Sequence, residues 1–170
     1  MALQTSAIDH VGVAVPDLDA AIGFYTDTLG GRLVHRETNV AQGIEEAMID
    51  FNGADGSPGG GALLQLLAPL GPESTIRKFL DRNGPGLQQL AFRVDDVRAA
   101  AEAARAAGVR TLYDEPRPGT AGSSINFLHP KDAGGVLVEL VEPAAGQRAA
   151  HDAPGVASTE SAQASGTMER

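Results

Sequence analysis

An internal duplication constrains this chain more than any other feature of its sequence. Residues 60–69, GGALLQLLAP, align without a gap with residues 134–143, GGVLVELVEP. A longer pair, residues 8–33 and 87–112, matches in order, and each member predicts a short apolar strand, an Asp-bearing turn and a helix that ends at glycine. Because such self-similarity marks a repeated supersecondary unit, the chain is expected to contain two copies of one module.

The two predicted helices carry matching start and stop signals. Asp17 and Asp96 precede the helical segments and are expected to cap them, because an Asp side chain can accept hydrogen bonds from the first free N–H groups of a helix. Gly30 and Gly108 follow the segments and suit the left-handed conformation in which many helices end. The helices should therefore extend to about positions 29 and 107.

Further extended segments lie between the helix and the final strand of each module. They are LVHRETNV and EEAMIDF, residues 33–40 and 45–51, in the first module, and TLYDEP and SINFLHP, residues 111–116 and 124–130, in the second. Each module is therefore predicted to have the order β-α-β-β-β.

These elements predict an α+β fold with one domain over residues 7–143. Module one covers about 7–70 and module two about 86–143, and a linker over about 71–85 carries a short helix near Ser74. One helix cannot cover a four-stranded sheet alone, so the two βαβββ modules are expected to pair and to form curved mixed sheets around a cleft.

Composition narrows the class of protein further. Residues 144–170 are rich in Ala, Ser, Gly, Thr and Gln without apolar periodicity, which predicts a disordered C-terminal tail. The start of the chain lacks a basic and apolar leader, and no run approaches the roughly 18 apolar residues of a membrane span, so a cytoplasmic protein without a membrane partner is expected. The net charge of −9, without a basic run, argues against nucleic-acid binding. The absence of cysteine excludes disulfides and thiolate ligands, so any metal must be bound by His, carboxylate or amide groups.

Four polar residues interrupt the apolar strands at matched positions in the two modules. His10 aligns with Gln89 in the first strands, and Gln65 aligns with Glu139 in the last strands. Taken singly, each could be an ordinary strand residue that is hydrogen-bonded or faces solvent. Equivalent positions of paired modules converge near the pseudo-twofold axis, however, and a buried amide or carboxylate is costly unless it is paired or coordinated. The four residues therefore predict a metal site whose donors suit Co²⁺, Mn²⁺, Mg²⁺ or Ni²⁺ better than structural Zn²⁺.

The motifs DHVGVAVPDLDAAIGFY, QGIEEAM, APLGPES, YDEPRPG and LHPK, with GGVLVEL, resemble methylmalonyl-CoA epimerases of the vicinal oxygen chelate superfamily over about residues 7–143. The resemblance implies one divalent metal, with Co²⁺ expected first, held by His10, Gln65, Gln89 and Glu139. It also implies an acyl-CoA thioester substrate and a homodimer. Where many members of the family carry two histidines, this chain has Gln88 and Gln89, so an amide replaces an imidazole among the implied ligands.

The implied reaction interconverts (2R)- and (2S)-methylmalonyl-CoA by removing and returning the proton on C2. From the strand pattern alone, Glu46 could be a surface residue or could face the cleft; the resemblance implies that it is one base, with Glu139 as the candidate on the opposite face. Arg117 and Lys131 are available for the CoA phosphates, although no substrate-binding residue is identified. Alternatives remain open: an epimerase for another 2-substituted malonyl-CoA, a glyoxalase I-like lyase, or a non-catalytic small-ligand binding protein of the same fold.

Overall fold

The structure, a computed structural model, describes residues 3–51 and 61–145. The first module contains β1 (Ala7–Ala14), α1 (Leu18–Gly23), the π-helical turn η1 (Phe24–Thr28), β2 (Arg32–Asn39), β3 (Ile44–Asp50) and β4 (Leu63–Pro69). The linker helix α2 (Thr75–Asn83) leads to the second module, which contains β5 (Gly86–Arg93), α3 (Val97–Ala106), β6 (Arg117–Pro118), η2 (Thr120–Gly122), β7 (Ser124–Leu128), η3 (Pro130–Asp132) and β8 (Val138–Glu142).

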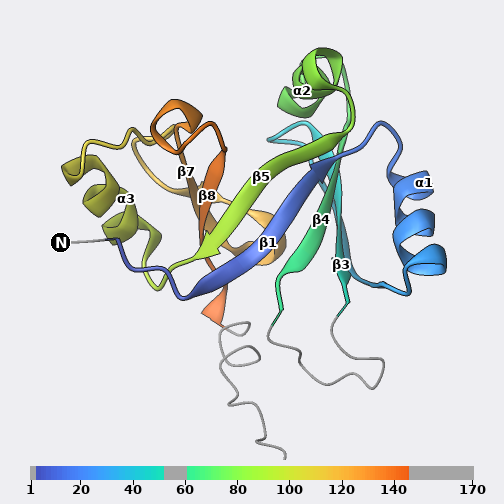
Figure 1. Ribbon diagram of the computed structural model, residues 1–170, viewed down its shortest axis with the longest axis horizontal. Coiled ribbons are helices and arrows are strands. Elements are labelled where there is room, and N and C mark those ends of the chain that lie inside the picture. Colours follow the sequence, from blue (N-terminus) through green and yellow to red (C-terminus); the bar gives the residue numbers. More distant parts are fainter. Residues whose placement is uncertain (1–2, 52–60, 146–170) are drawn as a thin grey trace, which may run out of the picture.

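The eight strands within residues 3–51 and 61–145 belong to one sheet with the order β2-β3-β4-β1-β5-β8-β7-β6. The second half of this order repeats the first in reverse, because β1 pairs parallel with β4, β5 pairs parallel with β8, and β1 and β5 pair antiparallel at the centre. The sheet curls into a half-barrel (Figure 1). The prediction of two paired βαβββ modules in an α+β fold is confirmed.

The helices begin and end at the residues that carry the capping signals. The Asp17 side chain accepts from the Ala20 N–H at 2.9 Å, and the Asp96 side chain accepts from the Ala99 N–H, also at 2.9 Å. Gly30 and Gly108 have φ values of 74° and 82°. The first helix changes from α to π geometry at Phe24, which the sequence did not predict.

One predicted strand is wrong. The segment at 111–116 forms only an isolated bridge from Thr111 to Leu128, and the strand in this place is the two-residue β6. Pro116 lacks the N–H group that a strand ladder needs. The carbonyl oxygens of residues 113 and 114 accept hydrogen bonds from the Arg105 side chain instead.

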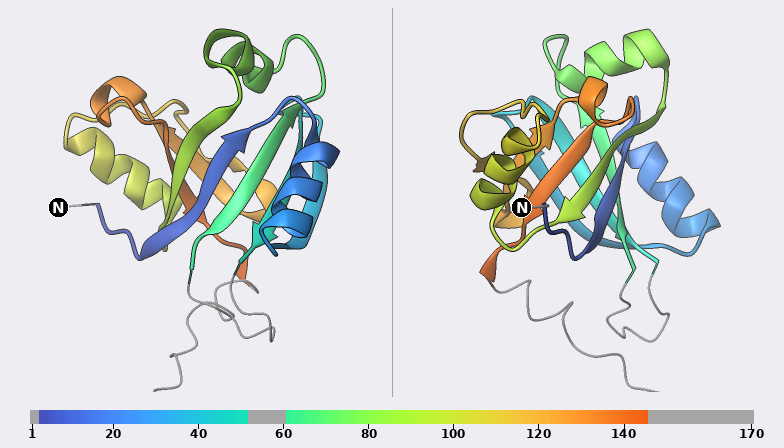
Figure 2. Two further views of the ribbon diagram at one scale, coloured as in Figure 1. Left: turned by 45° about the vertical axis from the view of Figure 1, so that its right-hand side comes forward. Right: turned by 60° about the vertical axis from the view of Figure 1, so that its left-hand side comes forward.

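Helices α1 and α3 cover the outer face of the sheet and do not cover its concave face (Figure 2). Strand alternation directs Ala47, Ile49 and Leu66 into one buried cluster with Leu18 of α1. In the second module, Leu140 packs in a corresponding cluster with residues of α3. Burial of each large side chain contributes about 1.5–3 kcal/mol, so the apolar set of each strand fixes which residues face inward.

The concave face is closed at one end by α2, whose buried Ile76 and Leu80 pack against Ile44 and Leu67. No helix within residues 3–51 and 61–145 is long and apolar enough to span a membrane. The tail predicted over 144–170 lies outside the described residues from position 146 onward.

Candidate metal and catalytic site

The four residues at matched positions meet on the concave face. His10, Gln65 and Glu139 are buried, and Gln89 is half-buried. The Gln89 Nε2 group donates to Glu139 Oε2 and, at 3.1 Å, to Gln65 Oε1, and it lies 3.4 Å from His10 Nε2. His10 Nε2 lies 3.1 Å from Glu139 Oε2. The structure therefore brings together all four residues that the sequence selected.

The register of β1 and β5 explains this convergence. His10 lies opposite Ala91, and Gln89 lies opposite Gly12, so the two pairs are related by the pseudo-twofold axis. The Gln89 side chain crosses directly over Gly12, where an added Cβ atom would come within 2.5 Å of its Cγ atom. A side chain at position 12 would therefore collide with the Gln89 side chain.

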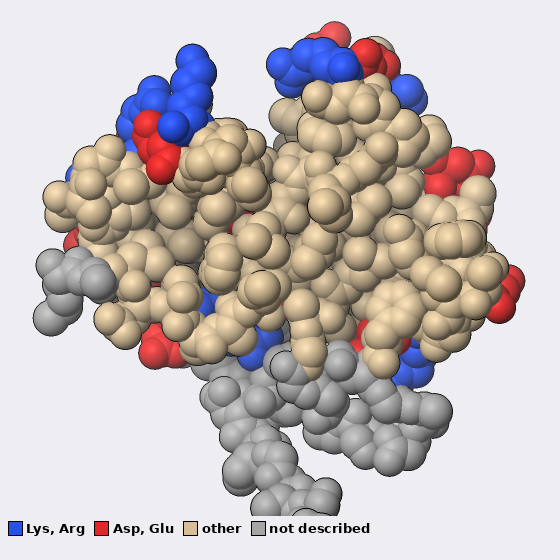
Figure 3. Space-filling model, in the orientation of Figure 1, with Lys and Arg blue, Asp and Glu red and all other residues tan. Residues whose placement is uncertain are grey.

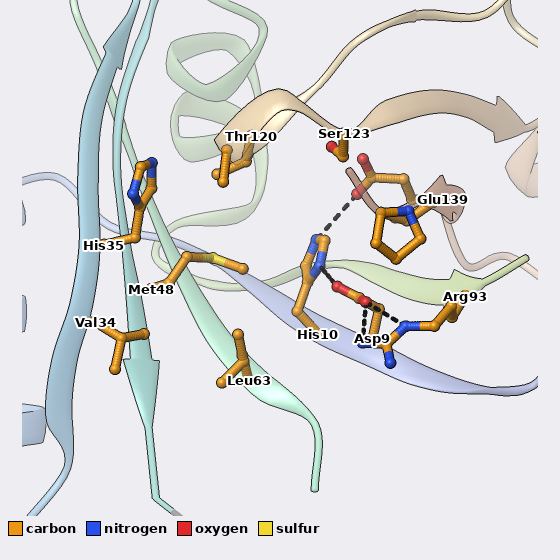
Figure 4. A pocket seen from close by; sticks show the side chains of 13 residues that line it. Asp9, His10, Val34, His35, Met48, Leu63, Arg93, Thr120, Ser123 and Glu139 are labelled. Atoms are coloured by element: carbon orange, nitrogen blue, oxygen red, sulfur yellow. Dashed lines mark hydrogen bonds and ion pairs between the residues drawn. The ribbon is translucent and has the colours of Figure 1, made fainter. Parts of the chain in front are cut away.

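Asp9 and Arg93 hold the His10 ring in place (Figure 4). Asp9 Oδ1 lies 2.9 Å from His10 Nδ1, and Asp9 Oδ2 accepts two hydrogen bonds from Arg93, at 2.6 and 3.0 Å. A register shift between Ile8 and His10 allows these neighbouring side chains to lie together. Although burial opposes the charged ring, hydrogen bonds to Asp9 and Glu139 raise the pKa of His10 to about 9. This support was not predicted, because its only signal in the sequence is an Asp next to the first-strand histidine.

Glu46 faces the same side as the cluster and is almost fully buried, with 1% of its surface exposed. Its Oε2 atom accepts from Gln65 Nε2 at 2.7 Å and from the Thr120 hydroxyl at 2.9 Å. Thr120 belongs to η2 of the second module and was not singled out by the sequence. In the part of the chain that the structure describes, Glu46 Oε1 has no hydrogen-bond partner.

The environment of Glu46 suits proton transfer. Burial raises its pKa to about 7; the Thr120 hydrogen bond opposes this shift, and the Glu37 carboxylate opposite it on β2 adds to it. A carboxyl group whose pKa lies near neutral pH can both take up and return a proton. Glu45 faces away from the cluster and binds Arg36 at 2.6 Å. Of the two possibilities that the strand pattern left open for Glu46, the buried position facing the cluster is the one observed.

Gln88 departs from simple strand alternation. The pairing passes from Gly12 opposite Gln89 to Val13 opposite Leu87, which leaves Gln88 in a bulge. Gln88 and Gln89 both line a small cavity, and Gln88 Oε1 is buried without a partner among residues 3–51 and 61–145.

Two cavities adjoin the cluster. The larger, of about 340 Å³, is lined from both modules, by His35 and Met48 on one side and Ser123 and Glu139 on the other (Figure 4). The smaller, of about 50 Å³, contains Glu46, Gln65, Gln89 and Glu139 in its wall. The larger volume lies within the range of about 300–1,000 Å³ that is usual for small-molecule sites.

The donor set is unusual in its dependence on amides. The described residues contain no group of three or more His, Asp or Glu side chains that could hold a metal ion. One imidazole and one carboxylate are present, and two amides can supply oxygen, which together fit a divalent ion of mixed nitrogen and oxygen preference. The hydrogen bond that His10 donates to Asp9 through its far ring nitrogen is also typical of a metal-binding histidine.

Comparisons with known proteins place this chain and its fold in a class. The model of the Glyoxalase/Bleomycin resistance protein/Dioxygenase superfamily matches residues 7–140. The structure of methylmalonyl-CoA epimerase from Mycobacterium tuberculosis has 54% sequence identity and a TM-score of 0.76, over 87% of this chain and 94% of that chain. A variant of the Streptomyces coelicolor methylmalonyl-CoA epimerase, in complex with 2-nitronate-propionyl-CoA, has 48% identity and a TM-score of 0.77, over 84% of this chain and 97% of that chain. The ethylmalonyl-CoA/methylmalonyl-CoA epimerase of Cereibacter sphaeroides is 36% identical over 78% of this chain and 95% of its own length.

The chain belongs to the glyoxalase and bleomycin resistance protein superfamily and, within it, to the methylmalonyl-CoA epimerase family. The resemblance to this family that its motifs indicate is confirmed. Membership of this family implies a divalent metal ion, and the donors described above fit one.

Proposed function

We propose that this protein interconverts (2R)- and (2S)-methylmalonyl-CoA by moving the proton on C2. The observation that carries the proposal is the buried Glu46 carboxyl, which has a pKa of about 7 and lies beside the four-residue cluster on the concave face. The relatives support the substrate class, since one of them is described in complex with 2-nitronate-propionyl-CoA.

His10, Gln65, Gln89 and Glu139 are the proposed metal ligands. Co²⁺ is the ion proposed first, with Mn²⁺, Ni²⁺ and Mg²⁺ as alternatives, because the set combines one imidazole with oxygen donors. A divalent ion bound there supplies Lewis acidity, which stabilises negative charge on the oxygen of the enolate. Asp9 keeps the Nδ1 proton of His10 in place, so that Nε2 faces the centre of the site.

Glu46 is the proposed base on one face of C2. Thr120 and Gln65 hold its Oε2 atom, and Oε1 remains able to accept a proton. Glu139 is the proposed acid–base group on the opposite face, because it lines both cavities. Positioned groups of this kind contribute roughly 10²–10⁴ each in rate.

Positive charge on the surface near the concave face suits the anionic CoA part of the proposed substrate. Figure 3 shows Lys and Arg side chains gathered on two lobes with a hollow between them, one lobe over α2 and the other over the region that holds η3. Helix α2 contributes Arg77, Lys78 and Arg82, and η3 contributes Lys131. These groups are candidates for contacts with the CoA phosphates despite the net charge of −9.

Ethylmalonyl-CoA is a second candidate substrate, since the Cereibacter sphaeroides relative is named for both thioesters. One methylene changes binding in an apolar pocket by only about 1–3 kcal/mol. Comparison of kcat/KM for the two thioesters measures this preference directly.

The test of the proposed function is a stereochemical assay in D₂O. The metal-loaded protein should convert (2S)-methylmalonyl-CoA into a mixture of both epimers, with deuterium incorporated at C2. Turnover of a glutathione hemithioacetal without this exchange would favour the lyase alternative, and binding of the thioester without exchange would favour a non-catalytic protein. The homodimer and the cytoplasmic location stay predictions, and light scattering in solution tests the first.

A further inference from the structure

The centre of the ligand cluster is occupied by the Gln89 amide nitrogen. Glu139 Oε2 and Gln65 Oε1 both accept from Gln89 Nε2, and His10 Nε2 lies 3.4 Å from it. The donor atoms of the three other proposed ligands therefore surround this one NH₂ group.

An amide NH₂ group donates hydrogen bonds and has no lone pair available for a cation. Gln89 can act as a ligand only through Oε1, which requires a half-turn of the carboxamide about the Cγ–Cδ bond. This half-turn breaks the hydrogen bonds from Nε2 to Glu139 and Gln65.

We propose that Gln89 is a metal-selectivity residue with two states: in one its NH₂ group donates to Glu139 and Gln65, as in this structure, and in the other, reached by the half-turn, its Oε1 atom would face the ion. This inference rests on the ligand assignment of the proposed function. Entry of an ion must replace the hydrogen bonds of the free state, so the affinity is lower than that of a site with a ready imidazole in this place. Because an amide oxygen is a hard donor, the loss should be greater for Co²⁺ and Zn²⁺ than for Mn²⁺.

Gly12 keeps Gln89 within reach of both states. The Gln89 Cγ atom lies so close to the Gly12 backbone that a methyl group there would meet it at 2.5 Å. The terminal carboxamide is thus held over the site by the packing of its own stem, and the half-turn needs only the last side-chain bond to rotate.

The first experiment is calorimetric titration of Mn²⁺, Co²⁺ and Zn²⁺ into the full-length protein and its Gln89→His variant. The variant should bind Co²⁺ and Zn²⁺ at least about tenfold more tightly than the unmodified protein, and its gain for Mn²⁺ should stay below about threefold. Leu87→His is the matched control, because Leu87 lies on the same strand and is 73% exposed. Equal affinities of the two proteins for all three ions, or the same gain in the control, would overturn the inference.

A second measurement uses the unmodified protein and does not depend on the folding of a variant. The side-chain NH₂ resonances of Gln89 are assigned from their connectivity to its backbone resonances. In the free protein one of the two protons should be shifted by its bond to Glu139, and saturation with diamagnetic Zn²⁺ should remove that shift. Resonances that stay unchanged at saturation would contradict the half-turn.

Neither measurement uses turnover, so the two proposals can fail separately. If Gln89→His shows the expected gains in metal affinity but the unmodified protein does not epimerise the thioester in D₂O, the proposed function is refuted and the role of Gln89 stands. Epimerisation with no difference in metal binding between the protein and Gln89→His would do the reverse.

Discussion

The place that Glu46 fills in the first module is filled by Ile125 in the second. Glu46 pairs with Leu67, which lies two residues after Gln65. In the same way, Ile125 pairs with Val141, which lies two residues after Glu139. Glu46 and Ile125 are both buried, yet one is a carboxylic acid and the other is apolar. The duplicated scaffold therefore supplies the proposed ligands in related pairs, whereas the strand beside the last strand places a buried carboxyl group in only one module. In the proposed mechanism, two unlike groups therefore serve the two faces of C2.

The largest effect should come from removal of this asymmetric base. Glu46→Gln keeps shape and hydrogen bonding and removes basicity, so epimerisation should fall by roughly 10²–10⁴ while metal content persists. Rates measured at saturating thioester test this. Glu45→Gln is the internal control, because Glu45 faces the other side and binds Arg36; comparable activity of the Glu46 variant and the unmodified protein would remove Glu46 from the mechanism.

A second contrast concerns the residues just before His10 and Gln89. Asp9 and Gln88 both occupy register shifts, but only Asp9 bonds to its neighbouring ligand. Asp9→Asn should weaken metal binding by about 10–100-fold, the usual cost of losing such a supporting carboxylate. Gln88→Ala should change it by less than about threefold, as measured by titration calorimetry. Equal losses would show that the two bulges contribute alike.

The two matched residues His10 and Gln89 should differ in how they make metal affinity depend on pH. His10 carries a proton below its pKa of about 9 and must lose the Nε2 proton to coordinate, whereas the amide of Gln89 has no such proton. Apparent metal affinity should therefore rise with pH, by at most about tenfold per unit, and level off near pH 9. Titrations at pH 6, 7 and 8 measure the slope, and an affinity independent of pH would exclude His10 as a ligand.

The smallest effects should be equal in the two modules. Asp17→Ala and Asp96→Ala each remove a cap with a 2.9 Å hydrogen bond and should lower the free energy of unfolding by about 1 kcal/mol. The exposed Asp95→Ala change should stay within about 0.5 kcal/mol. Urea denaturation gives all three values; a much larger loss at Asp17 would show that the π-helical end of the first helix depends on its cap.

The sequence predicted the parts of this molecule that repetition or local chemistry determines. The capping residues, the module order and the four convergent residues all follow from signals that occur twice. The short β6 was not predicted, because the apolar residues near Leu112 favour a strand although Pro116 interrupts it. Asp9 and Thr120 were not predicted as site residues, and the bulge at Gln88 was not predicted either. Bulges and a cross-module loop place these three residues, and neither leaves a periodic pattern in the sequence.

The two strands at the ends of the sheet order, β2 and β6, bear on how copies of this chain can associate. An outermost strand offers a row of unpaired N–H and C=O groups to which another chain can add. Strand β6 is only two residues long and includes Pro118, while β2 carries the charged Arg32, Arg36 and Glu37. Growth of the sheet by a strand from a neighbouring molecule is disfavoured at both edges, so the predicted homodimer has to bury other surfaces.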